Sequence, residues 1–213
     1  MATRARREPD APTPGDGYVQ SFARGLEVIR SFSAEASVQT LSEVAARSGL
    51  TRAGARRILL TLQALGYVHS DGKHYRLTPR ILELGFSYLT ALPIWNLAEP
   101  VMERLADAVG ESCSAAVLDG TDIVYVLRVH THKIMAINLN VGTRLPAWCT
   151  SLGRVLLAGL DDAEVKARLK ASDIRANTRH TATDMGELLA RVQQVRSQGC
   201  ALVNQELEEG LIS

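Results

Sequence analysis

Three arginines lie close together at what the sequence pattern predicts to be the start of a helix: Arg52, Arg56 and Arg57. Thr51 and Ala53 lie beside them. A helix-turn-helix presents the basic start of its second helix to the major groove of DNA in this way. The pattern predicts that Thr51, Arg52, Ala53 and Arg56 read the groove and that Arg57 holds a phosphate.

The elements that would position these arginines are predicted by residues 41–66. Leu41, Val44 and Ala45 recur at helical spacing, and Gly49 follows where a helix end favours a residue tolerant of positive φ. Thr51 can then cap a second helix. Four apolar residues of that helix are expected to be buried: Ile58, Leu59, Leu62 and Leu65. A generic helical hairpin with a solvated basic face is the alternative.

A hairpin is predicted directly after this second helix. Two short alternating runs flank residues 70–73, and the Asp71-Gly72 pair between them is a strong turn signal. A hairpin in this place makes a winged helix-turn-helix, on which Lys73 and Arg76 would hold backbone phosphates. His74 is an ordinary exposed strand residue or a further contact. The first helix of the motif is expected at residues 21–32.

The composition favours a cytoplasmic protein. No apolar run approaches the roughly 18 residues of a membrane span, and residues 1–17 lack the apolar core of a signal peptide. We expect these residues to form a disordered basic arm. Cys113, Cys149 and Cys200 are far apart, without metal-ligand spacing, so neither a metal site nor a cofactor is expected.

The charge is divided unevenly along the chain. Residues 1–80 hold twelve Lys and Arg against seven Asp and Glu, whereas the remainder holds twelve against sixteen. A basic front and an acidic rear fit a DNA reader joined to a part that does not touch DNA. Phosphate attraction would make its binding sensitive to salt.

The rear part begins with helices and continues as a sheet. Residues 80–98 are predicted to form linker helices, and the apolar residues of the first of them wrap more than one side, which favours packing against a second subunit over an internal core helix. In the next helix, Ile94–Gly110, four residues are expected to form a buried stripe: Leu97, Val101, Leu105 and Val109. Strands are expected at 114–118, 122–129, 134–141 and 201–205, with helices up to 160, from 161 and over 184–199.

The chain resembles the IclR family of bacterial transcriptional regulators. The resemblance covers residues 18–213 and rests on 21–29, the helix-turn-helix, 75–78, Gly142-Thr-Arg-Leu-Pro146 and Thr150-Ser-Leu-Gly-Arg-Val-Leu-Leu-Ala158. Residues 18–26 and 134–139 look most like the β-ketoadipate-pathway branch, whose members respond to protocatechuate, 4-hydroxybenzoate or β-ketoadipate. The resemblance implies homodimers, often paired into tetramers.

The implied fold is α+β. A winged helix-turn-helix (residues 18–79) would precede the linker helices and a GAF/PAS-like effector-binding domain with an antiparallel sheet (residues 99–213). Two reading helices on a dimer predict a pseudo-palindromic operator in double-stranded DNA. The family normally continues past the point corresponding to Ser213, so part of the effector domain is expected to be missing here.

The effector chemistry can be argued from residues 150–153. A loop enters a helix there, so free backbone N–H groups favour an anion, with hydroxyls from Thr150 and Ser151 and close approach at Gly153. Arg144 either pairs the carboxylate of a small organic acid or only supports the loop, and Trp148 would add apolar wall. By similarity with family pockets, the ligand-lining positions are Ile134, Ser151, Leu152 and Ser213. Val203 stands where a relative has a pocket Asp, which puts that contact in doubt.

Three other interpretations remain. Cys149 near a helix start could be the activated thiolate of an enzyme acting on a small carboxylic acid, although no convincing histidine partner is present. A plain capped helix is the alternative for residues 150–153, and a winged helix used only for protein contacts is the third.

Overall fold

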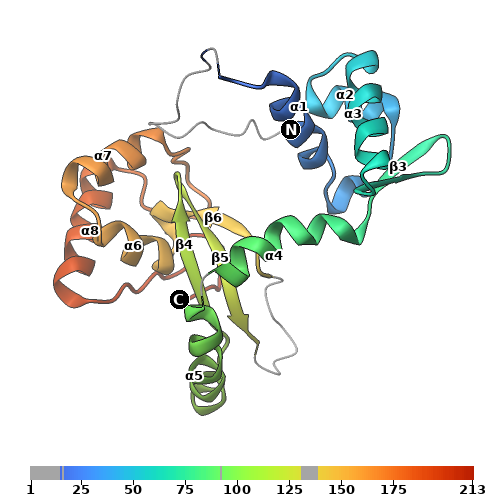
Figure 1. Ribbon diagram of the computed structural model, residues 1–213. Helices are drawn as coiled ribbons and strands as arrows, with labels where there is room; N and C mark the ends of the chain where they lie inside the picture. Colours follow the sequence, from blue (N-terminus) through green and yellow to red (C-terminus); the bar gives the residue numbers. More distant parts are fainter. Residues whose placement is uncertain (1–14, 16, 92, 131–138) are drawn as a thin grey trace. The chain divides into compact units, whose positions relative to one another are not determined.

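The computed structural model describes residue 15 and residues 17–91, 93–130 and 139–213. Contacts divide these residues into two compact units, one reaching to residue 91 and the other running from Pro93 to Ser213 (Figure 1). Predictions for the arm, residues 1–17, fall almost entirely outside the described residues. Each unit has a hydrophobic core of its own.

The first unit consists of helices and one small antiparallel sheet. Its elements are α1 (Gln20–Arg30), η1 (Ala34–Ala36), β1 (Gln39–Thr40), α2 (Leu41–Ser48), α3 (Arg52–Ala64), β2 (Val68–Ser70), β3 (His74–Leu77), η2 (Pro79–Ile81) and α4 (Leu82–Ala91). The antiparallel sheet has the order β1-β3-β2. The core is formed by Val28, Val44, Ala45, Ala55, Leu59, Leu62 and Val68. This is the expected winged helix-turn-helix.

Local signals set the ends of α2 and α3. Thr40 and Glu43 form a reciprocal capping box at the start of α2. Gly49 ends α2 with φ +67°, in the left-handed region that glycine adopts without steric cost. Thr51 caps α3, since its Oγ1 accepts a hydrogen bond from the Gly54 N–H at 3.1 Å. The predicted turn at Gly49 and the predicted Thr51 cap are confirmed.

The linker helix α4 buries none of its side chains within the described residues. Large apolar side chains stand exposed on it, among them Leu82, Leu84, Phe86 and Tyr88. The interpretation of α4 as an internal core helix is therefore wrong.

The second unit combines one three-stranded sheet with helices. Its elements are α5 (Ile94–Val109), β4 (Cys113–Asp119), β5 (Asp122–Val129), β6 (Arg144–Pro146), η3 (Ala147–Cys149), α6 (Ser151–Ala158), α7 (Asp162–Ala171) and α8 (Met185–Gln198). The antiparallel order is β4-β5-β6. Ile123 and Tyr125 of β5 pack in one core with residues of η3, α6, α7 and α8. Helices beside an antiparallel sheet match the predicted fold class.

Three details of this unit differ from expectation. Strand β6 was not predicted, whereas most of the strand predicted at 134–141 lies outside the described residues. In place of a strand at 201–205 there is an isolated bridge between Asn204 and Ile212. The predicted stripe of α5 is not buried: Leu97 is 75% exposed, and Val101, Leu105 and Val109 are also exposed. Helix α5 packs against β4 and β5 and buries Ala106 instead.

Among the described residues, no single helix combines the length and apolarity of a membrane span, and only Pro79–Ala91 and Ile94–Val109 taken together pass by length and composition.

Candidate functional site

The three arginines in the first two turns of α3 are exposed. Ala55, Leu59 and Leu62 face the core, while Arg52 and Arg56, one helical turn apart, are exposed. Arg57 is exposed as well, and within the described residues none of the three guanidiniums has an ion pair. These charges are therefore available to an anionic partner.

Two smaller residues complete this face. The Thr51 hydroxyl accepts the Gly54 N–H, which leaves its own O–H free to donate. Ala53 is exposed between Arg52 and Arg56 and presents only a methyl group. A surface with donors around one methyl group suits the edges of base pairs, because thymine carries a methyl group in the major groove.

The wing is held together by the side chain of Asp71. Its Oδ1 accepts the N–H of Lys73 at 2.9 Å and that of His74 at 2.7 Å, and its Oδ2 lies 3.2 Å from Nδ1 of His74. Hydrogen bonds from the His74 and Lys73 backbone, followed by the His74 ring, hold the pKa of Asp71 far below its usual range. The ring of His74 is thus occupied in supporting the turn.

The charged side chains of the wing point into solvent. Lys73 and Arg76 are exposed, and Arg76 pairs in register with His69 of β2. His69 is exposed too and lies beside Arg76, a neighbour that sequence analysis did not single out. His69 could have been identified from the sequence by pairing the two strands of the hairpin across the Asp71-Gly72 turn.

In the second unit, Thr150 caps α6. Its Oγ1 accepts the N–H of Gly153 at 3.2 Å and donates to the carbonyl of Pro146 at 3.0 Å. A Cβ on Gly153 would lie 2.2 Å from the carbonyl oxygen of Ala147. Gly153 therefore allows the backbone of η3 to lie close against α6. The space beside its Cα is filled by this backbone and not left open for a ligand.

Ser151 is brought to the end of the described chain. Its Oγ lies 3.0 Å from Oγ of Ser213. Backbone hydrogen bonds in both directions between Val203 and Ser213 hold this last residue, at 2.7 and 2.9 Å. Two hydroxyls from positions 62 residues apart thus meet at the start of α6.

The other residues predicted to line the effector site differ in burial and in their contacts. Leu152 is half-buried, Trp148 is buried in the core, and Ile134 lies outside the described residues. Arg144 binds Asp119 through Nη1 and lies 3.4 Å from Asp122 through Nε. These ion pairs support the loop, and a role of Arg144 in binding the carboxylate stays a prediction.

A buried ion cluster behind α6 was missed by sequence analysis. Arg154 donates two hydrogen bonds to the carboxylate of Glu206, at 2.7 and 2.6 Å, and Nε donates to the carbonyl of Trp148. Arg191 of α8 binds the same carboxylate. Arg154 and Glu206 are each 3% exposed. This cluster ties α6 and α8 to the segment that carries Ser213.

Cys149 does not have the properties of a nucleophile. The side chain is fully buried, and burial raises the pKa of its thiol to about 12. Its sulfur accepts a weak hydrogen bond from Asn177 at 3.7 Å. A thiol in this state is protonated at neutral pH, so the enzyme interpretation loses its nucleophile. Among the described residues no group of His, Cys, Asp and Glu could hold a metal ion.

The exposed basic helix of a winged helix-turn-helix, joined in one chain to a separate α+β unit, defines a transcriptional regulator. Residues 21–72 match the model of the IclR helix-turn-helix domain, and residues 86–213 match that of the bacterial transcriptional regulator IclR C-terminal domain. The chain belongs to the IclR family of DNA-binding transcriptional regulators and is not an enzyme.

Known proteins of this family are similar to the chain over most of its length. The Pca regulon regulatory protein of Pseudomonas putida is 43% identical over 214 residues, 100% of this chain and 73% of that protein. A crystal structure of a transcriptional regulator from Rhodococcus sp. RHA1 is 52% identical with a TM-score of 0.80, over 92% of this chain and 78% of that one. An IclR homolog from Microbacterium hydrocarbonoxydans complexed with 4-hydroxybenzoate is 26% identical with a TM-score of 0.76, over 89% and 78%.

Proposed function

We propose that this regulator controls genes for the catabolism of aromatic acids and responds to a small aromatic acid such as 4-hydroxybenzoate or protocatechuate. The similarity to a Pca regulon regulator and to a homolog that holds 4-hydroxybenzoate supports this pathway. Such a protein acts in the cytoplasm, where operator DNA lies.

DNA reading is assigned to the exposed face of α3. Arg52, Arg56, Thr51 and Ala53 enter the major groove, and Arg57, Lys73 and Arg76 hold phosphates on either side. The observation that carries this assignment is the exposure of the α3 arginines without ion pairs in the described part of the chain. Three exposed guanidiniums without ion pairs at the start of one helix, directly after the turn of a helix-turn-helix, form the arrangement that enters a major groove.

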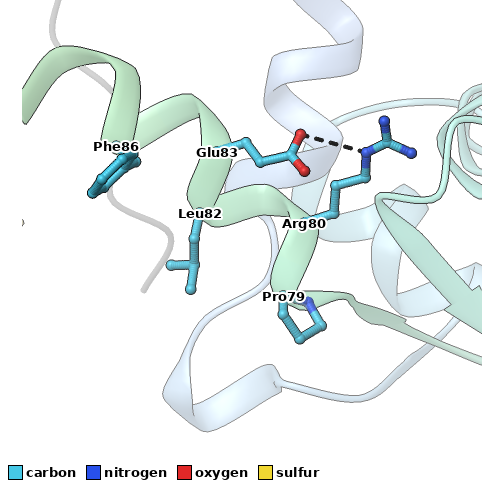
Figure 2. Close-up of a pocket in the computed structure, with 5 residues that line it drawn as sticks. All are labelled: Pro79, Arg80, Leu82, Glu83 and Phe86. Atoms are coloured by element: carbon cyan, nitrogen blue, oxygen red, sulfur yellow. Dashed lines mark hydrogen bonds and ion pairs between the residues drawn. The ribbon is translucent and has the colours of Figure 1, made fainter. Parts of the chain in front are cut away.

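A second copy of the chain is proposed to cover the apolar surface of the first unit. A groove of about 680 Å³ is lined by Pro79, Arg80, Leu82, Glu83 and Phe86. Figure 2 shows the side chains of Leu82 and Phe86 pointing away from Arg80 and Glu83. Phe22 of α1, 68% exposed, lines a further groove of about 490 Å³. Burial of such apolar surface favours association of two copies, and two reading helices match a pseudo-palindromic operator.

The effector site is assigned to the start of α6. Ser151 and Ser213 supply hydroxyl donors to a carboxylate or phenol, the N–H groups of the first turn favour negative charge, and Leu152 with Ile134 supplies apolar wall. Thr150, Gly153 and Trp148 shape this helix start from behind, and Arg144 holds the neighbouring hairpin. The effector changes DNA affinity by binding one of two conformations more tightly.

The test is binding of the purified protein to duplex DNA. Fluorescence anisotropy with duplexes selected by the protein from a random pool should show a palindromic preference and a steep loss of affinity with salt. Light scattering should give a dimer, or a dimer of dimers. Absence of binding even in dilute buffer would overturn the assignment of α3.

A further inference from the structure

The exit of α3 and the entry of the linker are joined by a run of hydrogen bonds. Three successive carbonyls, those of Leu65, Gly66 and Tyr67, follow the last turn of α3. The first accepts from Nη1 of Arg80 at 3.0 Å. The second accepts from Oγ1 of Thr78 at 2.6 Å, and the third from the backbone N–H of Thr78 at 2.9 Å.

The Leu65 carbonyl stands at the end of α3, where the last carbonyls have no partner within the helix, and those of Gly66 and Tyr67 belong to the turn between α3 and β2. Gly66 adopts φ +82°, a left-handed conformation that turns its carbonyl out of the helical direction. Both donor residues, Thr78 and Arg80, flank Pro79, whose ring fixes φ at the start of η2. The contact therefore joins two stiff elements.

Arg80 makes two further contacts that orient it. Its guanidinium carbon lies 5.5 Å from the centroid of the Tyr67 ring, within the range of a cation–π interaction. Its Nε lies 3.4 Å from Oε2 of Glu83, in the first turn of α4. Arg80 thus contacts the end of the reading helix through Nη1 and the linker helix through Nε; Figure 2 shows the second of these contacts, with Glu83.

From these contacts we infer that Thr78 and Arg80 form a joint that fixes the direction of α4 relative to the reading helix α3. Arg80 is a positioning residue, and it is distinct from the arginines that contact DNA. The functional part of this inference rests on the proposed function: when two copies assemble through α4, the joint sets the separation and angle of the two reading helices. Without the joint, each reading helix would still bind its half-site, but the dimer would discriminate poorly between operators with different half-site spacing.

The joint can be tested on the protein without DNA. Spin labels at Gln63→Cys on α3 and Ser87→Cys on α4, with Cys113 and Cys200 replaced by serine, give a distance distribution. Labelled protein is diluted into unlabelled protein so that only distances within a chain are read. We expect a narrow distribution for the parent and a clearly broader one for Arg80→Met, which keeps the aliphatic stem and loses the guanidinium. An unchanged width in Arg80→Met would overturn the inference, whatever the DNA result.

The matched control is Arg24→Met on α1. It removes the same charge from the same unit at an exposed position, and it should leave the distribution narrow. Arg80→Lys serves as a second variant should Arg80→Met fold poorly by circular dichroism. Lysine keeps the charge but cannot contact Leu65 and Glu83 with the fixed fork of a guanidinium, so it should broaden the distribution to an intermediate width.

The functional arm compares duplexes whose half-sites are one base pair closer or further apart than in the selected site. The parent and Arg24→Met should discriminate among them, whereas Arg80→Met should lose most of that discrimination, several-fold or more, while keeping the salt dependence of binding. If the parent binds no duplex, the proposed function fails and the label distances still decide the joint. If Arg80→Met discriminates as the parent does, the joint has no role in operator reading.

Discussion

Arg154 and Glu206 face each other as a two-bond ion pair inside the second unit, with side chains 3% and 4% exposed. Glu206 also accepts from Arg191 and, at 3.4 Å, from the N–H of Ala182. Each charge in this cluster depends on the others, because a charged group removed from water is tolerated only when it is paired.

We predict that Glu206→Gln destabilises the protein strongly. The substitution leaves two guanidiniums near a neutral amide, and breaking a buried ion pair from one side costs about 3–5 kcal/mol in the free energy of unfolding. Urea unfolding at fixed protein concentration measures it. Glu208→Gln, an exposed neighbour, should stay within about 0.5 kcal/mol of the parent. A small change in Glu206→Gln would show that the pair adds little stability.

Gly153→Ala tests the packing of α6 on η3. The added methyl group would meet the backbone of Ala147, which cannot move aside as a flexible side chain can. We expect a loss of about 1–3 kcal/mol, as for other overpacked sites. The control is Gly25→Ala in α1, where nothing lies within 4 Å of the new Cβ and helix propensity favours alanine by about 0.5–1 kcal/mol. Equal stability of the two variants would contradict the close approach of η3 and α6.

DNA-binding variants should separate reading from phosphate contact. Arg52→Ala should weaken binding to the selected duplex by about 1–3 kcal/mol and relax the preference at one position. Arg57→Ala should weaken all duplexes alike and lower the salt slope by about 1. Anisotropy titrations across a salt series measure both effects. Arg175→Ala, an exposed arginine of the second unit, should behave as the parent, and equal effects of all three would argue against a specific surface.

The effector prediction concerns the two serines. Addition of 4-hydroxybenzoate or protocatechuate should raise the melting temperature, because a ligand of the folded state stabilises it by mass action. Loss of one hydrogen-bonding hydroxyl in Ser151→Ala or Ser213→Ala should weaken the ligand roughly 3- to 10-fold. Ser197→Ala, at an exposed position on α8, is the control. Unchanged affinity in both pocket variants would move the effector site elsewhere.

The conformation of the wing should change with pH only in acidic solution. The folded-state pKa of Asp71 is lowered by N–H groups of His74 and Lys73, so the charged carboxylate stabilises the turn at every pH above its ordinary value of about 3.9. That contribution is lost as the pH falls from there through the lower folded-state pKa. Amide resonances of Lys73 and His74 should therefore move only in acid, and Asp71→Asn should abolish this titration. An unchanged titration in Asp71→Asn would contradict the role of this carboxylate in the turn.

The first unit could be predicted well from sequence because its signals are local. Gly49, the Thr51 cap and the Asp71-Gly72 turn each act within four residues, and the structure has them where the pattern places them. The interpretation of the arginines as exposed follows from the same helical register. Whether they contact DNA remains a prediction.

The second unit was predicted less completely because its contacts join distant parts of the chain. Arg154 and Glu206 are 52 residues apart, and nothing near either residue indicates the other. The two roles considered for Arg144 could not be separated from sequence, because its partners Asp119 and Asp122 lie 25 and 22 residues away in the chain. The stripe of α5 shows a further limit: helical spacing identified an apolar face, but spacing alone does not say whether the same chain covers it.

The tip of the β4–β5 hairpin is held from two sides. Arg144 of β6 binds Asp119, and Arg168 of α7 donates to the carbonyl of Gly120. If β5 slipped by one position against its neighbours, Ile123 would turn from the core toward the opposite face of the sheet, and Asp122 of β5 would move away from Arg144. Electrostatic anchoring at one end therefore selects a single alignment of this sheet, which makes insertions near residue 120 far more harmful than insertions in the exposed segment around residue 175.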